Sequence, residues 1–318
     1  MPTQFLSRAS GSVLSVVYNG FRRSQVDPCG CVSQQLGGLD REARLVKRIE
    51  EQGIPGIQVD AGGFVRDMAE ENIIVQSKFL LKGLGKIGYD AVNVGFTDLV
   101  MAPEELKKVA SDAGVPLVSA NITDESGALV FEPYVIKEVT LKDGSSLKVG
   151  MVGVTRPRVE LSNAADAPTS ATAGGVVLQI SDAGAALNKY TAELADKTDL
   201  VVALVYDRRT NAERIIGGLS DKSAVNVLVT GENTQIQGSV QALEGVQVVS
   251  GGYEGRQVGT LYLDLKDNKV AATWNRHIDV LQSIPPLPEV TAIIEETHRA
   301  TQQPDAPVPA DAPMKLQL

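Results

Sequence analysis

The side chains that most often bind transition metals or act as catalytic bases are scarce in this sequence. His277 and His298 are its two histidines, and Cys29 and Cys31 are its two cysteines. A centre of clustered imidazoles needs more histidines than this, and a tetrahedral site made of cysteines needs four of them. Both kinds of site are therefore excluded within one chain. We predict no catalytic residue, no metal-ligand set and no cofactor.

Cys29 and Cys31 are separated by a single glycine. A Cys-x-Cys pair can form a strained, reducible disulfide, give two thiolates to a metal shared with another chain, or bond to a partner chain. Alternatively, the two residues are loop thiols, or they form one small disulfide that stiffens loop 27–38. No lysine or histidine near them in the sequence would activate a thiolate, so a structural role is favoured.

Strand and helix patterns alternate around this loop. Residues 13–18 form a short apolar run rich in β-branched side chains, and the turn-rich loop 19–38 follows it. The next predicted elements are helix 40–52, strand 56–60, helix 69–84, strand 91–94, a helix from 103 to about 114, and strand 117–120. This alternation indicates a largely parallel sheet with helical crossovers.

The second half of the chain has a different character. An Asp143-Gly144 turn indicates a hairpin between residues 134–141 and 147–154. After it we predict a helix around 178–195, strand 200–206, a short helix at 211–219, strand 225–229, and strands 246–250, 258–265 and 270–278. We therefore expect an α/β fold with two sheets packed face to face and helices outside.

Charge and hydropathy restrict the class of protein. The 30 Lys+Arg against 39 Asp+Glu give a net charge of −9, which disfavours nucleic-acid binding because phosphate contacts need a basic surface. No apolar run approaches the roughly 20 residues that a membrane span requires. We expect one domain over 13–283, an N-terminal extension over 1–12, and a C-terminal helix with a Pro/Ala-rich flexible tail over 284–318.

Several motifs follow one another in a familiar order. They are DPCGCVSQQLGGLDREARLVKRI (27–49), VDAGGF (59–64), GYDAVNVGFTDL (88–99), PLVSANI (116–122), KVGMVGVT (148–155), DLVVALVYD (199–207), VNVLVTGENT (225–234) and VVSGGYEGRQVGTLYLDL (248–265). In sequence and order the chain resembles the catalytic domain of the 5′-nucleotidase and UDP-sugar hydrolase branch of the calcineurin-like metallophosphoesterases. The resemblance implies a four-layer sandwich of two mixed sheets with helices outside.

The PCGC and GGL segments look most like an exported bacterial subgroup, some of whose members are joined to multihaem cytochrome modules. The resemblance thus implies a periplasmic or extracellular location. It also implies a protein partner, such as a multihaem cytochrome or an envelope complex. No CxxCH haem-attachment motif is present in the sequence.

The family pattern has a two-metal centre whose ligands follow the strands, and this sequence has replaced those ligands. The Asp-x-His positions fall on Phe21 and Arg23, and the Asp after the second strand falls on Gly63. The remaining positions fall on Phe96, Thr97, Tyr206 and the segment 231–234, where Gly-His-x-His becomes Gly-Glu-Asn-Thr. Two-metal hydrolysis needs carboxylate and imidazole ligands, so the resemblance implies a scaffold without its catalytic ligands.

The loops around the replaced positions are rich in arginine. We expect a site that binds an anion or a partner, made of Arg22, Arg23, Arg66, Arg208, Arg209, Tyr206 and Glu232. In the alternative interpretation the aromatic residues fill a cavity, and the arginines are solvated or paired with Asp98, Asp207 and Glu232.

Three functions remain open at this point. The first is a catalytically inactive, metallophosphoesterase-like protein that acts as a binding, scaffold or assembly subunit, and it is the one that the sequence favours. The second is a residual phosphoesterase of the 5′-nucleotidase type. The third is a redox accessory to a multihaem cytochrome that uses Cys29 and Cys31.

Overall fold

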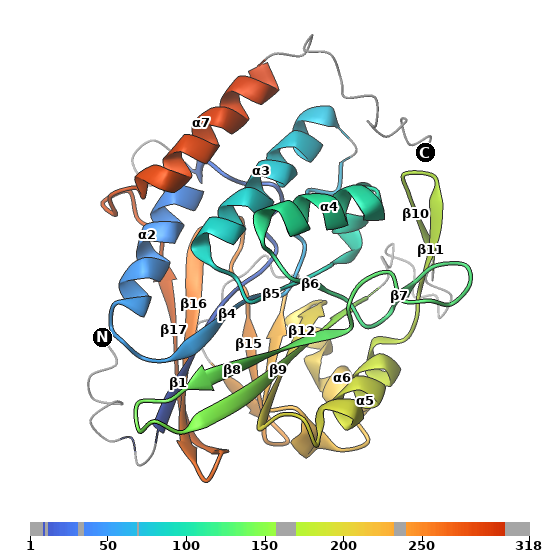
Figure 1. Ribbon diagram of the computed structural model, residues 1–318, viewed down its shortest axis with the longest axis vertical. Coiled ribbons are helices and arrows are strands. Elements are labelled where there is room, and N and C mark those ends of the chain that lie inside the picture. Colours follow the sequence, from blue (N-terminus) through green and yellow to red (C-terminus); the bar gives the residue numbers. More distant parts are fainter. Residues whose placement is uncertain are drawn as a thin grey trace.

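Two six-stranded sheets form the centre of the molecule (Figure 1). The computed structural model describes residues 9, 12–30, 35–68, 70–156, 170–231 and 240–302 of the 318-residue chain. The first sheet has the order β17 (Lys269–Asp279), β16 (Gln257–Lys266), β1 (Ser12–Asn19), β4 (Gly56–Asp60), β5 (Ala91–Asn93) and β6 (Leu117–Val118). The second has the order β14 (Gln241–Leu243), β15 (Val246–Ser250), β13 (Val227–Thr230), β12 (Leu200–Tyr206), β9 (Ser146–Thr155) and β8 (Tyr134–Thr140).

Both sheets are mixed. In the first, β1, β4, β5 and β6 are parallel, and β16 and β17 add antiparallel strands at one edge. In the second, β9, β12, β13 and β15 are parallel, and β8 and β14 are antiparallel edge strands. Smaller pairings join β7 (Ile122–Thr123), β10 (Ser170–Ala173) and β11 (Val176–Ile180), and β2 (Pro28–Cys29) with β3 (Leu36–Gly37). The predicted hairpin at Asp143-Gly144 is confirmed as β8–β9.

Helices cover the outer face of each sheet, which gives the expected four layers. The helices on the first sheet are α2 (Leu39–Glu50), α3 (Glu71–Ile87), α4 (Pro103–Ala113) and α7 (Pro288–Gln302). Those on the second are α5 (Ala183–Leu194) and α6 (Ala212–Gly217). Short 3-10 turns are η1 (Phe96–Val100), η2 (Arg209–Asn211) and η3 (Lys222–Ala224). Figure 1 shows α7 lying along α2 and α3, with which it packs.

Alternation along the strands builds three apolar layers. On β12, Leu200, Val202 and Leu204 face the layer between the two sheets, whereas the residues between them face α5 and α6. Every residue of β12 is buried, as expected of a parallel strand covered on both sides. Asn93 joins the sheets directly, because its Nδ2 donates to the carbonyl oxygens of Ala61 (3.1 Å) and Val154 (2.8 Å).

One predicted element is wrong at its beginning. The helix expected around 178–195 starts only at Ala183, and the preceding residues belong to strand β11. Asp182 sets the start, because its side chain accepts a hydrogen bond from the amide of Ala185 at 2.8 Å. The alternation in β11 between exposed and buried residues was too short to separate from a helical pattern. None of the helices in the described ranges has the length and apolar character that a bilayer crossing requires.

Candidate functional site

The carboxyl ends of strands from both sheets meet at one place. A Cβ atom on Gly20, just after β1, would lie 3.0 Å from the Cα of Gly231, just after β13. One on Gly231 would lie 2.7 Å from the carbonyl oxygen of Ala61, just after β4. The contact at Gly231 is closer than real Cβ atoms show, and the contact at Gly20 is at that limit. The close approach of the three loops therefore requires glycine at 231 and favours it at 20.

The loop after β1 is held against the loop after β4 by backbone hydrogen bonds. The amide of Phe21 donates to the carbonyl oxygen of Gly62 at 2.8 Å, and that of Arg23 donates to Gly63 at 3.0 Å. Phe21 and Arg23 have φ angles of 52° and 54°, a left-handed conformation that side-chain-bearing residues rarely adopt. The paired loops therefore hold these two side chains in fixed directions, at some conformational cost.

Three aromatic rings pack together beside these loops. We call Phe21, Tyr206 and Tyr253 the aromatic plug. The Phe21 ring centroid lies 6.5 Å from that of Tyr206 and 5.8 Å from that of Tyr253. Only 6% of Phe21 and 5% of Tyr206 is exposed. These two rings are therefore packed into the protein, and Tyr253 is half-buried beside Phe21.

The Tyr206 ring lies directly on two glycines. A Cβ on Gly63 would come within 2.5 Å of Tyr206 Cε2, and one on Gly95 within 2.6 Å of Tyr206 Cδ2. Any side chain at position 63 or 95 would overlap the ring. The position of the Tyr206 ring therefore requires glycine at 63 and at 95.

Asp98, in η1, ties the same loops together. Its carboxylate accepts hydrogen bonds from the amides of Gly63 (2.9 Å), Gly95 (2.7 Å) and Val65 (2.7 Å). Its burial raises its pKa to about 8, an effect that the three amide hydrogen bonds only partly oppose. The hydrogen-bonding capacity of the Asp98 side chain is thus used by backbone amides. Thr97, beside it, donates its hydroxyl to the Tyr206 oxygen at 3.4 Å.

Arg22 points away from the plug and is completely buried. Its guanidinium donates to both carboxylate oxygens of Glu42 (2.6 and 2.7 Å), to Asp60 (2.6 Å) and to the Tyr89 hydroxyl (2.6 Å). We call Arg22, Glu42, Asp60 and Tyr89 the buried ion network. Burial alone would lower the pKa of Arg22, but Glu42, Tyr89 and Asp60 raise it well above its ordinary value. Arg22 is therefore engaged inside the protein and not open to an external anion.

Sequence reasoning missed two members of this network, Glu42 and Tyr89. One signal for Glu42 was available: it lies on the apolar stripe of α2 with Leu39, Ala43 and Val46, all buried. A carboxylate on a buried stripe requires a cationic or hydrogen-bonding partner. Nothing in the sequence identified that partner as Arg22.

The other candidate arginines are spread around the plug. Arg23 lies over the Phe21 ring at 5.3 Å and pairs with Glu254 at 3.5 Å. Arg66 donates to Gln25 and Arg209 to Gln241, each at 3.4 Å. Arg208 is exposed. Glu232 lies outside the described residues, as does Cys31.

The acid Asp207, next to Arg208, has other partners than the sequence suggested. Arg156 Nε lies 2.6 Å from its carboxylate, and Arg214 lies 3.7 Å away. Its pKa is raised, mainly by burial, and Arg156 opposes that rise. Asp207 is therefore paired with Arg156 and Arg214, neither of which is among the candidate arginines named from the sequence.

Cys29 has a cationic neighbour that the sequence did not reveal. Arg256 Nη2 lies 3.0 Å from the Cys29 sulfur and 2.9 Å from Glu254. The two residues are 227 positions apart in the chain, so only the fold brings them together. The Arg256 guanidinium also lies 5.0 Å from the centre of the Tyr253 ring, which places Cys29 beside the aromatic plug.

The sequence is similar to those of known nucleotide phosphoesterases. No family model matches the sequence. The chain is 24% identical over 307 residues to the trifunctional nucleotide phosphoesterase protein YfkN of Bacillus subtilis, covering 83% of this chain and 20% of that protein. It is 29% identical over 194 residues to a 5′-nucleotidase of Vibrio cholerae, covering 60% of this chain and 33% of the relative. The chain thus spans a third or less of the length of these relatives.

Solved structures share the fold. A 5′-nucleotidase precursor from Thermus thermophilus superposes with a TM-score of 0.74 at 18% identity, over 91% of this chain and 59% of that one. The calcineurin-like phosphoesterase YfkN from Bacillus subtilis superposes with a TM-score of 0.68 at 19% identity, over 92% of this chain and 98% of that one. The chain is distantly homologous to the 5′-nucleotidase and calcineurin-like phosphoesterase family. The expected α/β sandwich of two mixed sheets is confirmed.

This homology implies a two-metal centre, and the described residues do not fit one. They contain no group of three or more His, Cys, Asp or Glu side chains that could share an ion. Three buried carboxylates near these strand ends have other partners: Asp60 faces Arg22, Asp98 accepts from backbone amides, and Asp207 pairs with Arg156. Instead of ligands, the predicted ligand positions hold the rings of Phe21 and Tyr206 and the glycine at 63.

Proposed function

We propose that this protein is a non-hydrolytic relative of the calcineurin-like phosphoesterases that acts by binding, as a scaffold or assembly subunit. The observation that carries this proposal is the packing of Tyr206 against Gly63 and Gly95. Two-metal hydrolysis requires ions a few ångströms apart with an activated water between them. The buried Tyr206 ring occupies space at these strand ends, and the described residues hold no group of three or more metal-binding side chains.

The remaining charged groups support the same proposal. Arg22 neutralises Glu42 and Asp60 at distances of 2.6 to 2.7 Å, so these carboxylates have their cation without a metal. Asp98 is committed to three amides. With these groups occupied, the exposed arginine-bearing loops around the plug are better suited to recognition than to bond cleavage.

Metal content and hydrolysis together test the proposal. Purified protein is dialysed against Mn²⁺ or Zn²⁺, its bound metal is measured, and hydrolysis of AMP and of bis(4-nitrophenyl) phosphate is assayed. The phosphoesterase domain of YfkN serves as the positive control. We expect substoichiometric metal and no hydrolysis above the buffer rate. Two metal equivalents per chain together with turnover would establish the residual phosphoesterase instead.

We further propose that the protein works outside the cytoplasm with a protein partner, such as a multihaem cytochrome or another envelope component. The resemblance of the PCGC and GGL segments to exported proteins supports this proposal. Affinity purification from the native source under mild conditions, followed by mass spectrometry and a haem-absorbance scan, tests it. A stoichiometric partner is expected, and recovery of the protein alone from the cytoplasmic fraction would contradict the proposal.

The contact between Arg256 and Cys29 favours a second candidate, a thiol–disulfide role. The guanidinium lies 3.0 Å from the Cys29 sulfur, and the Glu254 carboxylate lies 3.8 Å from it. As a thiolate, Cys29 would attack a disulfide of a partner to give a mixed disulfide and release one thiolate. In a Cys31→Ser background, Cys29 should react with an aromatic disulfide reagent faster than in the same protein carrying Arg256→Met. Lys142→Met, a change at an exposed turn, is the control for lost charge. Equal rates in all three proteins would exclude this role.

A further inference from the structure

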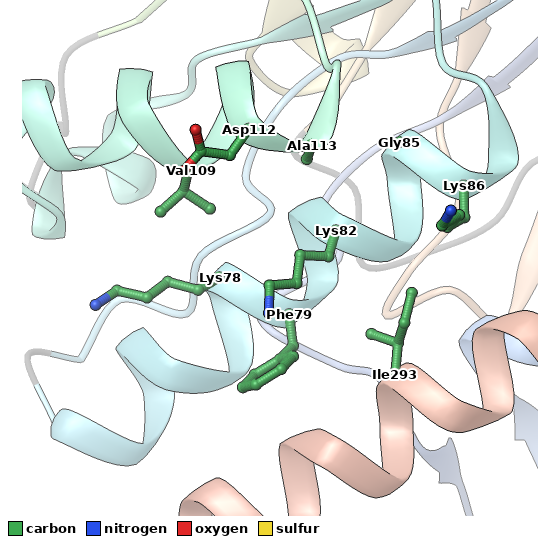
Figure 2. Close-up of a pocket in the computed structure, with 9 residues that line it drawn as sticks. All are labelled: Lys78, Phe79, Lys82, Gly85, Lys86, Val109, Asp112, Ala113 and Ile293. Atoms are coloured by element: carbon green, nitrogen blue, oxygen red, sulfur yellow. The ribbon is translucent and has the colours of Figure 1, made fainter.

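A groove of about 500 Å³ lies on the helical face of the first sheet, between α3, α4 and α7. Figure 2 shows its apolar walls, formed by Phe79 of α3, Val109 of α4 and Ile293 of α7. The volume lies within the range of about 300 to 1,000 Å³ that is usual for binding sites. The groove shares no residue with the aromatic plug or the buried ion network.

A row of lysines forms one side of this groove. Lys78, Lys82 and Lys86 are spaced four residues apart on α3 and line the groove together. Successive members of such a row are about 6 Å apart along the helix axis. Figure 2 shows all three on the same helix, with Lys78 and Lys86 at opposite ends of the row.

The acids around the groove leave this row incompletely neutralised. Lys78 pairs with Glu105 at 2.5 Å, and Lys82 has Glu296 at 3.8 Å, a pair in which both side chains are about half exposed. Lys82 also lies over the Phe79 ring, 4.2 Å from its centre. Asp112, an acid in the groove wall, pairs with Lys108 at 2.6 Å. Lys86 has no ion pair among the residues that the structure describes.

We propose that this groove binds an acidic, amphipathic helix of a protein partner. Acidic residues at positions i, i+4 and i+8 of such a helix repeat at the same interval of about 6 Å as the three lysines. Apolar residues on its adjoining stripe would contact Phe79 and Ile293, as in other groove-bound helices. A small carboxylate could reach only one or two of the lysines, whereas the full row spans about 12 Å.

This inference rests on the proposed role as a binding protein and gives that role a surface and a class of partner. The lysines supply orientation and faster association, and the apolar wall supplies most of the affinity. Binding should therefore depend on both charge and apolar side chains. It should weaken with rising salt without being abolished.

Fluorescence anisotropy with a defined probe tests the proposal. The probe is a labelled helical peptide of about 15 residues, with three glutamates at i, i+4 and i+8 beside a leucine stripe. Its control carries glutamine in place of the three glutamates. We expect the full-length protein to bind the acidic peptide about tenfold more tightly than the glutamine peptide, because three partly exposed charge pairs are lost in the control.

Two variants of the protein locate the site. Lys78→Gln/Lys82→Gln/Lys86→Gln should reduce the affinity about tenfold, whereas Lys142→Gln/Lys266→Gln/Lys269→Gln should change it less than about twofold. The control variant has the same change in net charge, at exposed hairpin turns at the opposite end of the molecule from α3 and α7 (Figure 1). Ile293→Glu, at a half-buried position on α7, should also weaken binding without disturbing the lysines.

Three results would overturn the proposal. They are no binding of the acidic peptide at about 1 mM, equal losses in both triple variants, or binding of phosphatidylglycerol vesicles with no binding of the peptide. Circular dichroism of each variant confirms that it is folded. The metal and hydrolysis measurements use the unmodified protein without peptide. Failure of the groove proposal is therefore distinguishable from failure of the proposed function.

Discussion

Phe21 and Arg22 are neighbours in the chain, but the side chain of Phe21 packs among apolar groups and that of Arg22 among charged ones. Phe21 joins the aromatic plug, where rings pack on rings and on glycine. Arg22 enters the buried ion network, where one guanidinium serves two carboxylates and a phenol. The same short loop thus sends neighbouring side chains into two different kinds of packing. Apolar rings occupy space on one side, and an internal cation supplies charge on the other.

The two regions differ in how their stability depends on each member. In the plug, the loss of one ring removes the apolar area that the ring buries and leaves a cavity. In the buried ion network, the loss of the cation leaves two charges without compensation in the interior of the protein. Substitutions in the network should therefore have larger effects than substitutions in the plug.

Arg22→Met should have the largest effect. It leaves Glu42 and Asp60, which are 1% and 0% exposed, buried without a cation, and should lower the free energy of unfolding by about 3 to 5 kcal/mol. Urea denaturation at pH 7 measures this change. Arg22→Met/Glu42→Met should recover part of the loss, and Arg208→Met, at an exposed position, should change stability by less than about 0.5 kcal/mol. A loss below about 1 kcal/mol for Arg22→Met would contradict the role of the network.

Tyr206→Ala should come next. Removing a buried ring opens a cavity beside Gly63 and Gly95 and should lower the free energy of unfolding by about 3 kcal/mol. Tyr206→Phe keeps the ring and removes the hydroxyl that Thr97 contacts, so it should lose about 1 kcal/mol or less. Thermal and urea unfolding compare the two variants. Equal effects would show that the hydroxyl, not the ring, is important.

Gly63→Ala tests the fit between the glycine and the ring. Its Cβ would overlap Tyr206 at 2.5 Å, and the φ of +75° is itself unfavourable for alanine, so a loss of about 2 kcal/mol is expected. Combined with Tyr206→Ala, the overlap with that ring should disappear, whereas the backbone part and the 3.1 Å approach to Phe21 Cδ2 should remain. A double-mutant cycle on urea unfolding measures this coupling. Strictly additive effects would mean that the ring and the glycine do not depend on each other.

Asp98 should make the free energy of unfolding depend on pH. Burial raises its pKa in the folded protein to about 8, well above that of the unfolded chain, so the folded state retains a proton that the unfolded state loses. Stability from this group is therefore present at acidic pH and falls as the pH rises from about 4 to 8, by up to about 1.4 kcal/mol per pH unit. Unfolding measured from about pH 5 to 8 should show a smaller fall in Asp98→Asn. Parallel curves for the two proteins would contradict this assignment.

The sequence predicts the layers of this fold better than the contacts at its centre. The continuous apolar run of β12 and the apolar stripe of α2 are local patterns in the sequence, and both elements appear where they were expected. The aromatic substitutions at 21 and 206 follow from the family resemblance and do come together. By contrast, the Arg22–Glu42 and Cys29–Arg256 contacts join residues that no local pattern relates. Such partners are set by the folded backbone.

Anomalous diffraction tests the central claim most directly. Crystals of the unmodified protein, equilibrated with Mn²⁺, would be measured at the manganese absorption edge. The account predicts that the rings of Phe21 and Tyr206 remain in contact over Gly63, with no anomalous peak between the carboxyl ends of β1, β4 and β12. Two peaks a few ångströms apart at that position, with the rings displaced, would contradict it.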